Sequence, residues 1–375
     1  MRLLYFTLDD SPHDFRFITS LAKTEHEVFV LRLERKGPLK EDRHLPENVK
    51  SITWKGGTQP FQFRQTLPLL KDLCRVIKEV QPDIIHAGPV QKPAFLAALS
   101  GFRPLVVMSW GSDILVDTHR NLLWNWITRF TLSRASLLLG DCEAVKNKAV
   151  SLGFDAQRVV LFPWGIDLES FSSGAPGELI QQLGWSDQCV FLSLRNWEPI
   201  YGVDLLVKAF AAACKQNNRI RLLMLGGGSM EKVIREIIQH EGIVDKIHLA
   251  GRVSQADLPV YYHSSQVYVS ASHSDGSSVS LMEALGCGLP VLVSDIPGNR
   301  EWITPGEQGW LFKDGSIDEL TDSFLTAFNQ RRDFDRLGKN ARKLALERAD
   351  WRKNFNVLLD AYRKALLLEG NIKDA

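Results

Sequence analysis

The stretch Gln266–Asp295, QVYVSASHSDGSSVSLMEALGCGLPVLVSD, decides the fold. Its first part, Gln266–Ser272, alternates apolar positions and is rich in β-branched and aromatic residues, which predicts a strand. The run Val279–Leu285 predicts a helix that ends at the glycines following it. Pro290–Val293 then predicts a second, fully buried strand. A strand, a helix and a strand in this order form one right-handed crossover of a parallel sheet, where ligands bind at the carboxyl ends of the strands.

Two carboxylates in this stretch, Asp275 and Glu283, stand eight residues apart across the predicted loop and helix. Asp275 can accept hydrogen bonds from the hydroxyls of one sugar and Glu283 from another polyol such as a ribose. The first backbone N–H groups of the helix can point at an anion, to which the helix dipole adds roughly 0.3–2 kcal/mol. The pattern therefore suits a nucleotide sugar with its pyrophosphate in the loop. The alternative is a pair of solvated charges, because this spacing arises by chance in many chains.

The segment DGSSVSLMEALGCGLPV (Asp275–Val291) resembles the signature of retaining, nucleotide-sugar-dependent glycosyltransferases of family four, which have the two-domain GT-B architecture. That signature is a Glu, seven residues and a second Glu, and here Asp275 takes the first place and Glu283 the second. The resemblance implies donor-sugar hydroxyls at Asp275 and ribose hydroxyls at Glu283. It implies that the diphosphate lies on the backbone of Gly276, Ser277, Ser278 and Val279. Asp is one methylene shorter than Glu, which predicts a different sugar pocket.

Length and composition indicate a protein of two domains without a polyanionic partner. The chain has 375 residues, of which 45% are hydrophobic, enough for two cores of ordinary size. Its 45 Lys and Arg balance 44 Asp and Glu, which argues against nucleic-acid binding. The five cysteines show no CxxC pairing and predict a reduced, cytoplasmic protein. No apolar run approaches the ~20 residues of a spanning helix, so we expect any contact with the inner membrane surface to be peripheral.

The order of strand and helix patterns predicts an α/β fold. Both halves alternate the two patterns, as in a doubly wound parallel sheet, and the Ser-, Gly- and Pro-rich stretch 165–178 between them reads as a linker. We predict two Rossmann-like domains in the GT-B arrangement with an interdomain cleft. The expected bounds are 1–168 for an acceptor-binding domain and 175–350 for a nucleotide-sugar domain. The resemblance implies that the terminal helix, about 351–370, returns to the first domain.

Arg195 ends the predicted strand VFLSLR, where its guanidinium could bind a diphosphate bidentately. The alternative is an exposed arginine at a strand end. In the resembled family this Arg is followed by a Lys-Gly pair, whereas this chain has Tyr201 and Gly202. Tyr201 can donate a hydrogen bond but carries no charge, which puts stabilisation of the leaving group in doubt. The resemblance also implies that backbone near Arg252 and Val253 lies beside the nucleotide base.

Three residues of the first half are candidates for acceptor chemistry. Asp113 follows a predicted buried strand in MSWGSDIL and is a plausible acceptor contact. His86 lies at a strand end, where it could orient or deprotonate an acceptor, although a lone histidine is more often structural. Trp110 stands where family members often carry His, either as a sugar-stacking platform or as a packed aromatic.

The expected substrates are a nucleotide-diphosphate sugar and a sugar, lipid-linked or small-molecule acceptor. No His, Cys or Asp cluster has metal-ligand spacing, so we expect no metal and no further cofactor. The segments Phe61–Val80 and Asn121–Arg134 mix cations with large apolar residues, as a surface helix on a membrane does, and an ordinary solvated helix is the alternative. The alternatives to a transferase are a nucleotide-sugar-binding subunit that has lost turnover, or an epimerase of the same fold.

Overall fold

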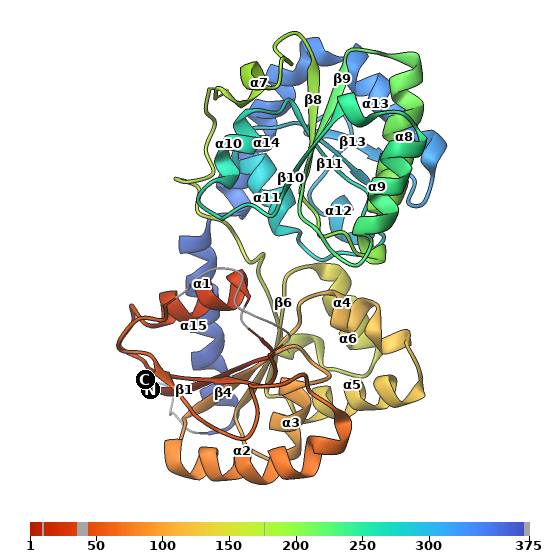
Figure 1. Ribbon diagram of the computed structural model, residues 1–375. Coiled ribbons are helices and arrows are strands. Elements are labelled where there is room, and N and C mark those ends of the chain that lie inside the picture. The colour runs from red at the N-terminus through yellow and green to blue at the C-terminus, as the bar shows by residue number, and fades with distance from the viewer. Residues whose placement is uncertain (10, 36–43, 176, 371–375) are drawn as a thin grey trace. The chain divides into compact units, whose positions relative to one another are not determined.

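The computed structural model describes residues 1–9, 11–35, 44–175 and 177–370, which form two compact units (Figure 1). The first unit consists of Met1–Phe162 and the segment that begins at Phe355, and the second of Pro163–Asn354. Each unit contains one parallel sheet covered by helices, which confirms the prediction of two Rossmann-like domains. The unit boundary at 162/163 precedes the linker stretch 165–178, of which residue 176 lies outside the described residues.

The first unit is built on a seven-stranded parallel sheet of order β3-β2-β1-β4-β5-β6-β7. Three of its seven strands are buried throughout and the first is buried except at Arg2, as expected of a sheet covered on both faces. The strands are β1 (Arg2–Thr7), β2 (Glu27–Arg32), β3 (Lys50–Ser51), β4 (Ile84–Ala87), β5 (Leu105–Met108), β6 (Leu137–Gly140) and β7 (Val159–Leu161). The helices are α1 (Pro12–Leu21), α2 (Thr66–Val80), α3 (Pro93–Leu99), α4 (Ser112–Leu115), α5 (Leu122–Arg134) and α6 (Glu143–Ser151).

The last helix, α15 (Trp351–Leu368), packs on the first unit, as predicted (Figure 1). Leu358, Tyr362 and Leu366 are buried along one face of this helix. The Tyr362 hydroxyl lies 2.5 Å from Nδ1 of His86 in β4. Just beyond the helix, the Glu369 carboxylate accepts a hydrogen bond from Ser136 at 2.7 Å. The chain thus returns from the second unit to the first through α15, and this helix completes the core of the first unit.

The second unit contains a six-stranded parallel sheet of order β10-β9-β8-β11-β12-β13. The strands are β8 (Cys189–Ser193), β9 (Ile220–Leu225), β10 (Ile247–Gly251), β11 (Val267–Ser270), β12 (Val291–Ser294) and β13 (Gly309–Phe312). The helices are α7 (Leu179–Gln182), α8 (Val203–Gln216), α9 (Glu231–His240), α10 (Leu258–His263), α11 (Val279–Gly286), α12 (Pro297–Arg300), α13 (Ile317–Asn329) and α14 (Phe334–Arg348).

Alternate side chains of strand β8 enter two separate cores of the second unit. Phe191 packs into a cluster with α8, α9 and α13, whereas Val190 and Leu192 join a cluster with α10, α11 and α14. Helix α8, which follows β8, belongs to the first cluster, and α11, which follows β11, belongs to the second. The chain therefore leaves these two adjacent strands toward opposite faces of the sheet. The strand order reverses at this point, and such a switch point leaves a crevice between the two departing loops.

Among the described residues, no helix has both the length and the apolarity that crossing a membrane would require.

We predict that Leu358→Ala destabilises the first unit by about 2–5 kcal/mol, because it removes a fully buried side chain from α15. The matched control is Leu367→Ala on the same helix, whose side chain is exposed and whose loss changes stability by less than about 0.5 kcal/mol. Urea unfolding followed by hydrogen exchange at the β1 and β4 amides measures both. Equal midpoints for the two variants would contradict the packing of α15 on this sheet.

Candidate functional site

The crevice between β8 and β11 brings Arg195 and Asp275 together. Arg195 follows β8 and Asp275 follows β11, and their side chains form an ion pair with Nη2 and Oδ2 2.7 Å apart. The two side chains are 12% and 20% exposed, so solvent screens the pair only in part. The Nη1 of Arg195 donates to the hydroxyls of Ser278 at 2.7 Å and Ser280 at 3.1 Å. One guanidinium thereby links the loop after β11 to the first turn of α11.

An aromatic ring holds Arg195 from the other side. The guanidinium carbon lies 4.2 Å from the centre of the Tyr201 ring, a cation–π contact of about 0.5–2 kcal/mol. Burial opposes the charge, but the negative field of Asp275, helped by Tyr268 and Tyr201, holds the pKa of Arg195 above its ordinary value. Arg195 is therefore a fixed positive charge, and its Nε is buried without a hydrogen-bond partner among the described residues. Tyr201 stands where the resembled family has Lys, and it contributes a ring in place of a charge.

Glu283 lies one turn inside α11 and is buried. Its Oε1 accepts a hydrogen bond from Gln255 at 2.9 Å and its Oε2 from the Tyr262 hydroxyl at 2.8 Å. Burial, followed by the Glu283 charge, raises the pKa of Tyr262, so that this hydroxyl stays protonated and donates. A carboxylate oxygen can accept more than one hydrogen bond, which is the chemistry that binding a diol requires.

The loop between Asp275 and α11 is fixed by close backbone packing. A Cβ at Gly298 would lie 2.5 Å from the carbonyl oxygen of Gly276 and 2.6 Å from that of Asp275, so only glycine fits there. The Ser277 hydroxyl accepts from the Trp302 indole at 3.0 Å. The side chain of Ser278, the residue before α11, makes no capping bond to the helix, and the first-turn N–H groups from Val279 onward have no acceptor within the helix. Those N–H groups can bind an anion.

Arg252 and Val253 follow β10 at the same carboxyl edge of the sheet. Arg252 is exposed, and a Cβ added at Gly227 would lie 3.5 Å from its Nε, so the side chain lies over the glycine loop after β9. Val253 is half-buried against the core cluster that contains α11. The structure thus gathers Arg195, Arg252 and Asp275 on one sheet edge.

In the first unit, His86 lies in β4 and is buried. Its ring is 4.6 Å from that of Tyr5 and 5.7 Å from that of Tyr362, centre to centre. Burial lowers the pKa of His86 from 6.5 to about 3, so the imidazole is neutral at physiological pH. This enclosure does not support the expected contact with an acceptor. His86 instead contacts Tyr362 and so joins α15 to the sheet.

Asp113 is also buried, and the donors around it belong to neighbouring loops. Its Oδ1 accepts from the Ser109 hydroxyl at 2.6 Å, and its Oδ2 accepts from the Val90 N–H at 3.0 Å. These bonds brace the loops after β4 and β5, and so favour a structural role over the expected acceptor contact. Trp110 is half-buried between His13, at 5.7 Å, and Phe17, at 6.2 Å, both measured between ring centres.

Several residues of the site gave no signal in the sequence. Tyr262 and Gln255 hold Glu283 only because α10 and the loop before it pack against α11. Ser280 binds Arg195 from a buried helix position that reads as part of an apolar face. Gly298 could have been noticed in the turn IPGN, but its close approach to Asp275 depends on the packing of α12. Within the described residues, no group of three or more His, Cys, Asp or Glu is placed to hold a metal ion.

Two family models match the chain and together span most of it. Residues 177–344 match the model described as "Glycosyl transferases group 1", and residues 2–141 match "Glycosyl transferase 4-like". The chain belongs to the family-four glycosyltransferases of the GT-B class. Asp275, Arg195 and Glu283 all lie within the first of these matches, so the resemblance found in the sequence extends over most of the second unit.

Individual relatives are distant. A D-inositol 3-phosphate glycosyltransferase of Gordonia bronchialis is 25% identical over 63% of this chain and 54% of its own length. The GtfA subunit of a Streptococcus pneumoniae UDP-N-acetylglucosamine–peptide N-acetylglucosaminyltransferase is 36% identical over 34% of this chain and 24% of its own. The chain thus spans about half or less of the length of these curated relatives.

The fold has close structural neighbours. The crystal structure of Anabaena HepE in complex with UDP has a TM-score of 0.80 to this chain at 20% identity, and the alignment covers 97% of this chain and 100% of HepE. The arrangement of elements is therefore shared over the full length.

We predict that His86 gives the first unit an acid-sensitive stability. Because its folded pKa is depressed from 6.5 to about 3, its contribution is fully present above pH 6.5 and is lost as the pH falls toward 3. The loss reaches up to about 1.4 kcal/mol per pH unit. His86→Gln should flatten this part of the acid limb in urea titrations, whereas His240→Gln, at an 86% exposed side chain, should leave it unchanged. An acid limb that is identical in wild type and His86→Gln would contradict the buried neutral imidazole.

Proposed function

We propose that the protein transfers a sugar from a nucleotide-diphosphate sugar to an acceptor hydroxyl with retention of the anomeric configuration. The observation that carries the proposal is the arrangement at the β8/β11 switch point. There a buried cation, Arg195, lies between an acid, Asp275, and the first turn of α11, while a second acid, Glu283, lies one turn further along. A sugar, a diphosphate and a ribose require these groups in this order.

The proposed donor pose assigns each part of the nucleotide sugar to one group of the site. The Glu283 carboxylate accepts both ribose hydroxyls, and the N–H groups from Val279 onward bind the diphosphate. Arg195 neutralises the charge that develops on the departing nucleoside diphosphate, for which one fixed cation can be worth about 3–4 kcal/mol of barrier. Asp275 orients the donor sugar through its hydroxyls. Because Asp275 also pairs with Arg195, sugar and diphosphate binding are coupled through one ion pair.

The proposal also includes transfer without a metal ion and a mechanism without a covalent intermediate. Arg195 supplies the positive charge that a metal ion provides elsewhere, so transfer should need neither metal nor cofactor and should survive chelation by EDTA. The only carboxylate in the loop after β11, Asp275, is held by Arg195, which argues against a covalent intermediate on it. We therefore favour same-face displacement assisted by the leaving group. NMR of the product anomer tests retention directly.

Two relatives suggest which nucleotide base to test first in the donor. GtfA is named for UDP-N-acetylglucosamine and HepE was solved with UDP, so UDP-sugars are the first donors to test. We assign the acceptor to the first unit, where two half-buried side chains, Trp110 in the loop after β5 and His13 in the first turn of α1, lie close together. The acceptor class remains a sugar, a lipid-linked sugar or a small molecule. Family membership and an intact Arg195 do not favour the alternatives, a subunit without turnover or an epimerase.

We predict that Glu283→Ala abolishes stabilisation by nucleotide. In a thermal-shift screen of UDP-, GDP- and ADP-sugars, the matching donor at 100 times Kd should stabilise the wild type by about 2.7 kcal/mol. Tyr262→Phe is the matched variant. It keeps the carboxylate and removes one donor to it, so the shift should shrink without vanishing. A full shift in Glu283→Ala would place the nucleotide elsewhere.

We predict that the ring of Tyr201, and not its hydroxyl, supports transfer. Tyr201→Phe keeps the stack under Arg195 and should retain near-wild-type kcat, whereas Tyr201→Ala releases the guanidinium and should lower kcat by roughly tenfold or more. Single-turnover transfer with radiolabelled donor is the measurement. If Phe and Ala at this position behave alike, the cation–π contact does not position Arg195.

A further inference from the structure

The first unit exposes a group of large apolar side chains that its own fold does not cover. Leu122 is 90% exposed, Leu67 70%, Leu123 56% and Trp126 54%, and Phe63 is exposed beside them. We call these five residues the α2–α5 patch. Single exposed apolar residues are normal on a protein surface, but five in two neighbouring segments need an explanation.

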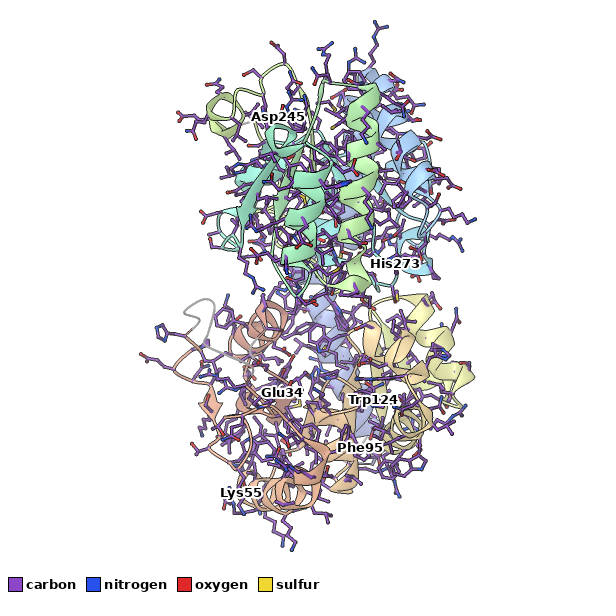
Figure 2. The ribbon with its side chains drawn as sticks, turned by 45° about the vertical axis from the view of Figure 1, so that its right-hand side comes forward. Glu34, Lys55, Phe95, Trp124, Asp245 and His273 are labelled. Atoms are coloured by element: carbon purple, nitrogen blue, oxygen red, sulfur yellow. The ribbon has the colours of Figure 1, made fainter. Side chains whose placement is uncertain are left out.

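One aromatic contact links the two segments. Phe63, in the short 3₁₀ helix that leads into α2, meets the ring of Trp124 in α5 with centres 6.0 Å apart. On α5, Leu122 and Trp126 are four residues apart and Leu123 and Trp126 three apart, so all three share one face. Helix α3 packs against both α2 and α5, and the ring of its Phe95, labelled in Figure 2, lies 6.2 Å from that of Trp126 in α5, centre to centre.

Positive charge surrounds the patch. Arg64 and Lys71 lie on either side of Leu67 in sequence, and the chain has no Asp or Glu from residue 48 to 71. Arg120 stacks 5.0 Å from the centre of the Trp124 ring, and there is again no Asp or Glu from residue 118 to 140. Two of the four acids that border these segments, Asp72 and Asp117, lie close to cations.

Of the four bordering acids, Glu47 is exposed and Asp141 is buried. Asp72 is buried and hydrogen-bonded to Arg75 at 2.8 Å, and Asp117 is half-buried in the field of Arg120 and Lys92. The exposed charge next to the apolar side chains is therefore positive, although the whole chain carries a formal charge of only +1.

We propose that the α2–α5 patch docks the first unit on the surface of an anionic lipid bilayer. Exposed Leu and Trp side chains on a helix that lies in the membrane plane enter the headgroup region, and neighbouring Lys and Arg bind anionic headgroups. A protein partner would cover an apolar patch equally well, but the cationic border and the absence of acids in both segments select a negatively charged surface. The inference does not depend on the proposed transfer, because docking needs no turnover.

Co-sedimentation of the full chain with vesicles tests the contribution of the apolar side chains to docking. With ~30% phosphatidylglycerol in phosphatidylcholine the wild type should partition strongly, and with phosphatidylcholine alone weakly. The variant L67S/L122S/L123S removes only exposed side chains and should lower partitioning by roughly tenfold or more. The control V233S/V244S/L346S removes three exposed apolar side chains from the second unit and should partition like the wild type.

The contribution of the charged side chains is tested with two variants of equal net charge. R64E/K71E should lose affinity for the anionic vesicles by roughly tenfold or more, whereas R332E/K343E, with the same change in formal charge on the second unit, should lose much less. Thermal unfolding and circular dichroism show that each variant is folded. The proposal is overturned if the wild type does not bind anionic vesicles, or if both triple variants bind alike. A wild type that ignores vesicles and forms dimers that L67S/L122S/L123S dissociates would make the patch a self-association face.

Discussion

The ion pair between Arg195 and Asp275 is the interaction on which the candidate site depends. It joins the loops after two adjacent strands, β8 and β11, at the point where the strand order reverses. The reversal sends α8 and α11 to opposite faces of the sheet, which opens the crevice, and the pair spans it. Ser278, Ser280 and Tyr201 then fix the guanidinium, so that a buried charge is paired, hydrogen-bonded and stacked.

Departures from the family signature make sense within this arrangement. Asp275 is shorter than the Glu usual at this place, and it reaches Arg195 at 2.7 Å. Tyr201 replaces a Lys, and its ring lies against the same guanidinium. The chain has thus exchanged a second cation for a more tightly held first one. Arg195 supplies positive charge to the proposed diphosphate site, and Asp275 and Tyr201, which both contact it, hold its guanidinium in place.

The sequence predicted the architecture well because its signals are local. Apolar runs and glycine turns located β11, α11 and β12 to within a residue or two, and the family resemblance implied that α15 would return to the first unit. The environment of each site residue was less accessible, because it depends on contacts between distant elements. No residue near Glu283 in the chain indicates that Tyr262 will donate a hydrogen bond to it. Likewise, no residue near His86 indicates its contact with Tyr362, which is 276 residues away. His86 and Asp113 were expected as candidate acceptor contacts, and both are buried among contacts with neighbouring elements.

A crystal structure of the protein with a bound nucleoside diphosphate tests the central claim most directly. The account predicts diphosphate oxygens within hydrogen-bond distance of the Arg195 guanidinium and of the N–H groups at the start of α11, with both ribose hydroxyls on Glu283. A nucleotide bound away from the β8/β11 crevice, with the pair of Arg195 and Asp275 untouched, would contradict it.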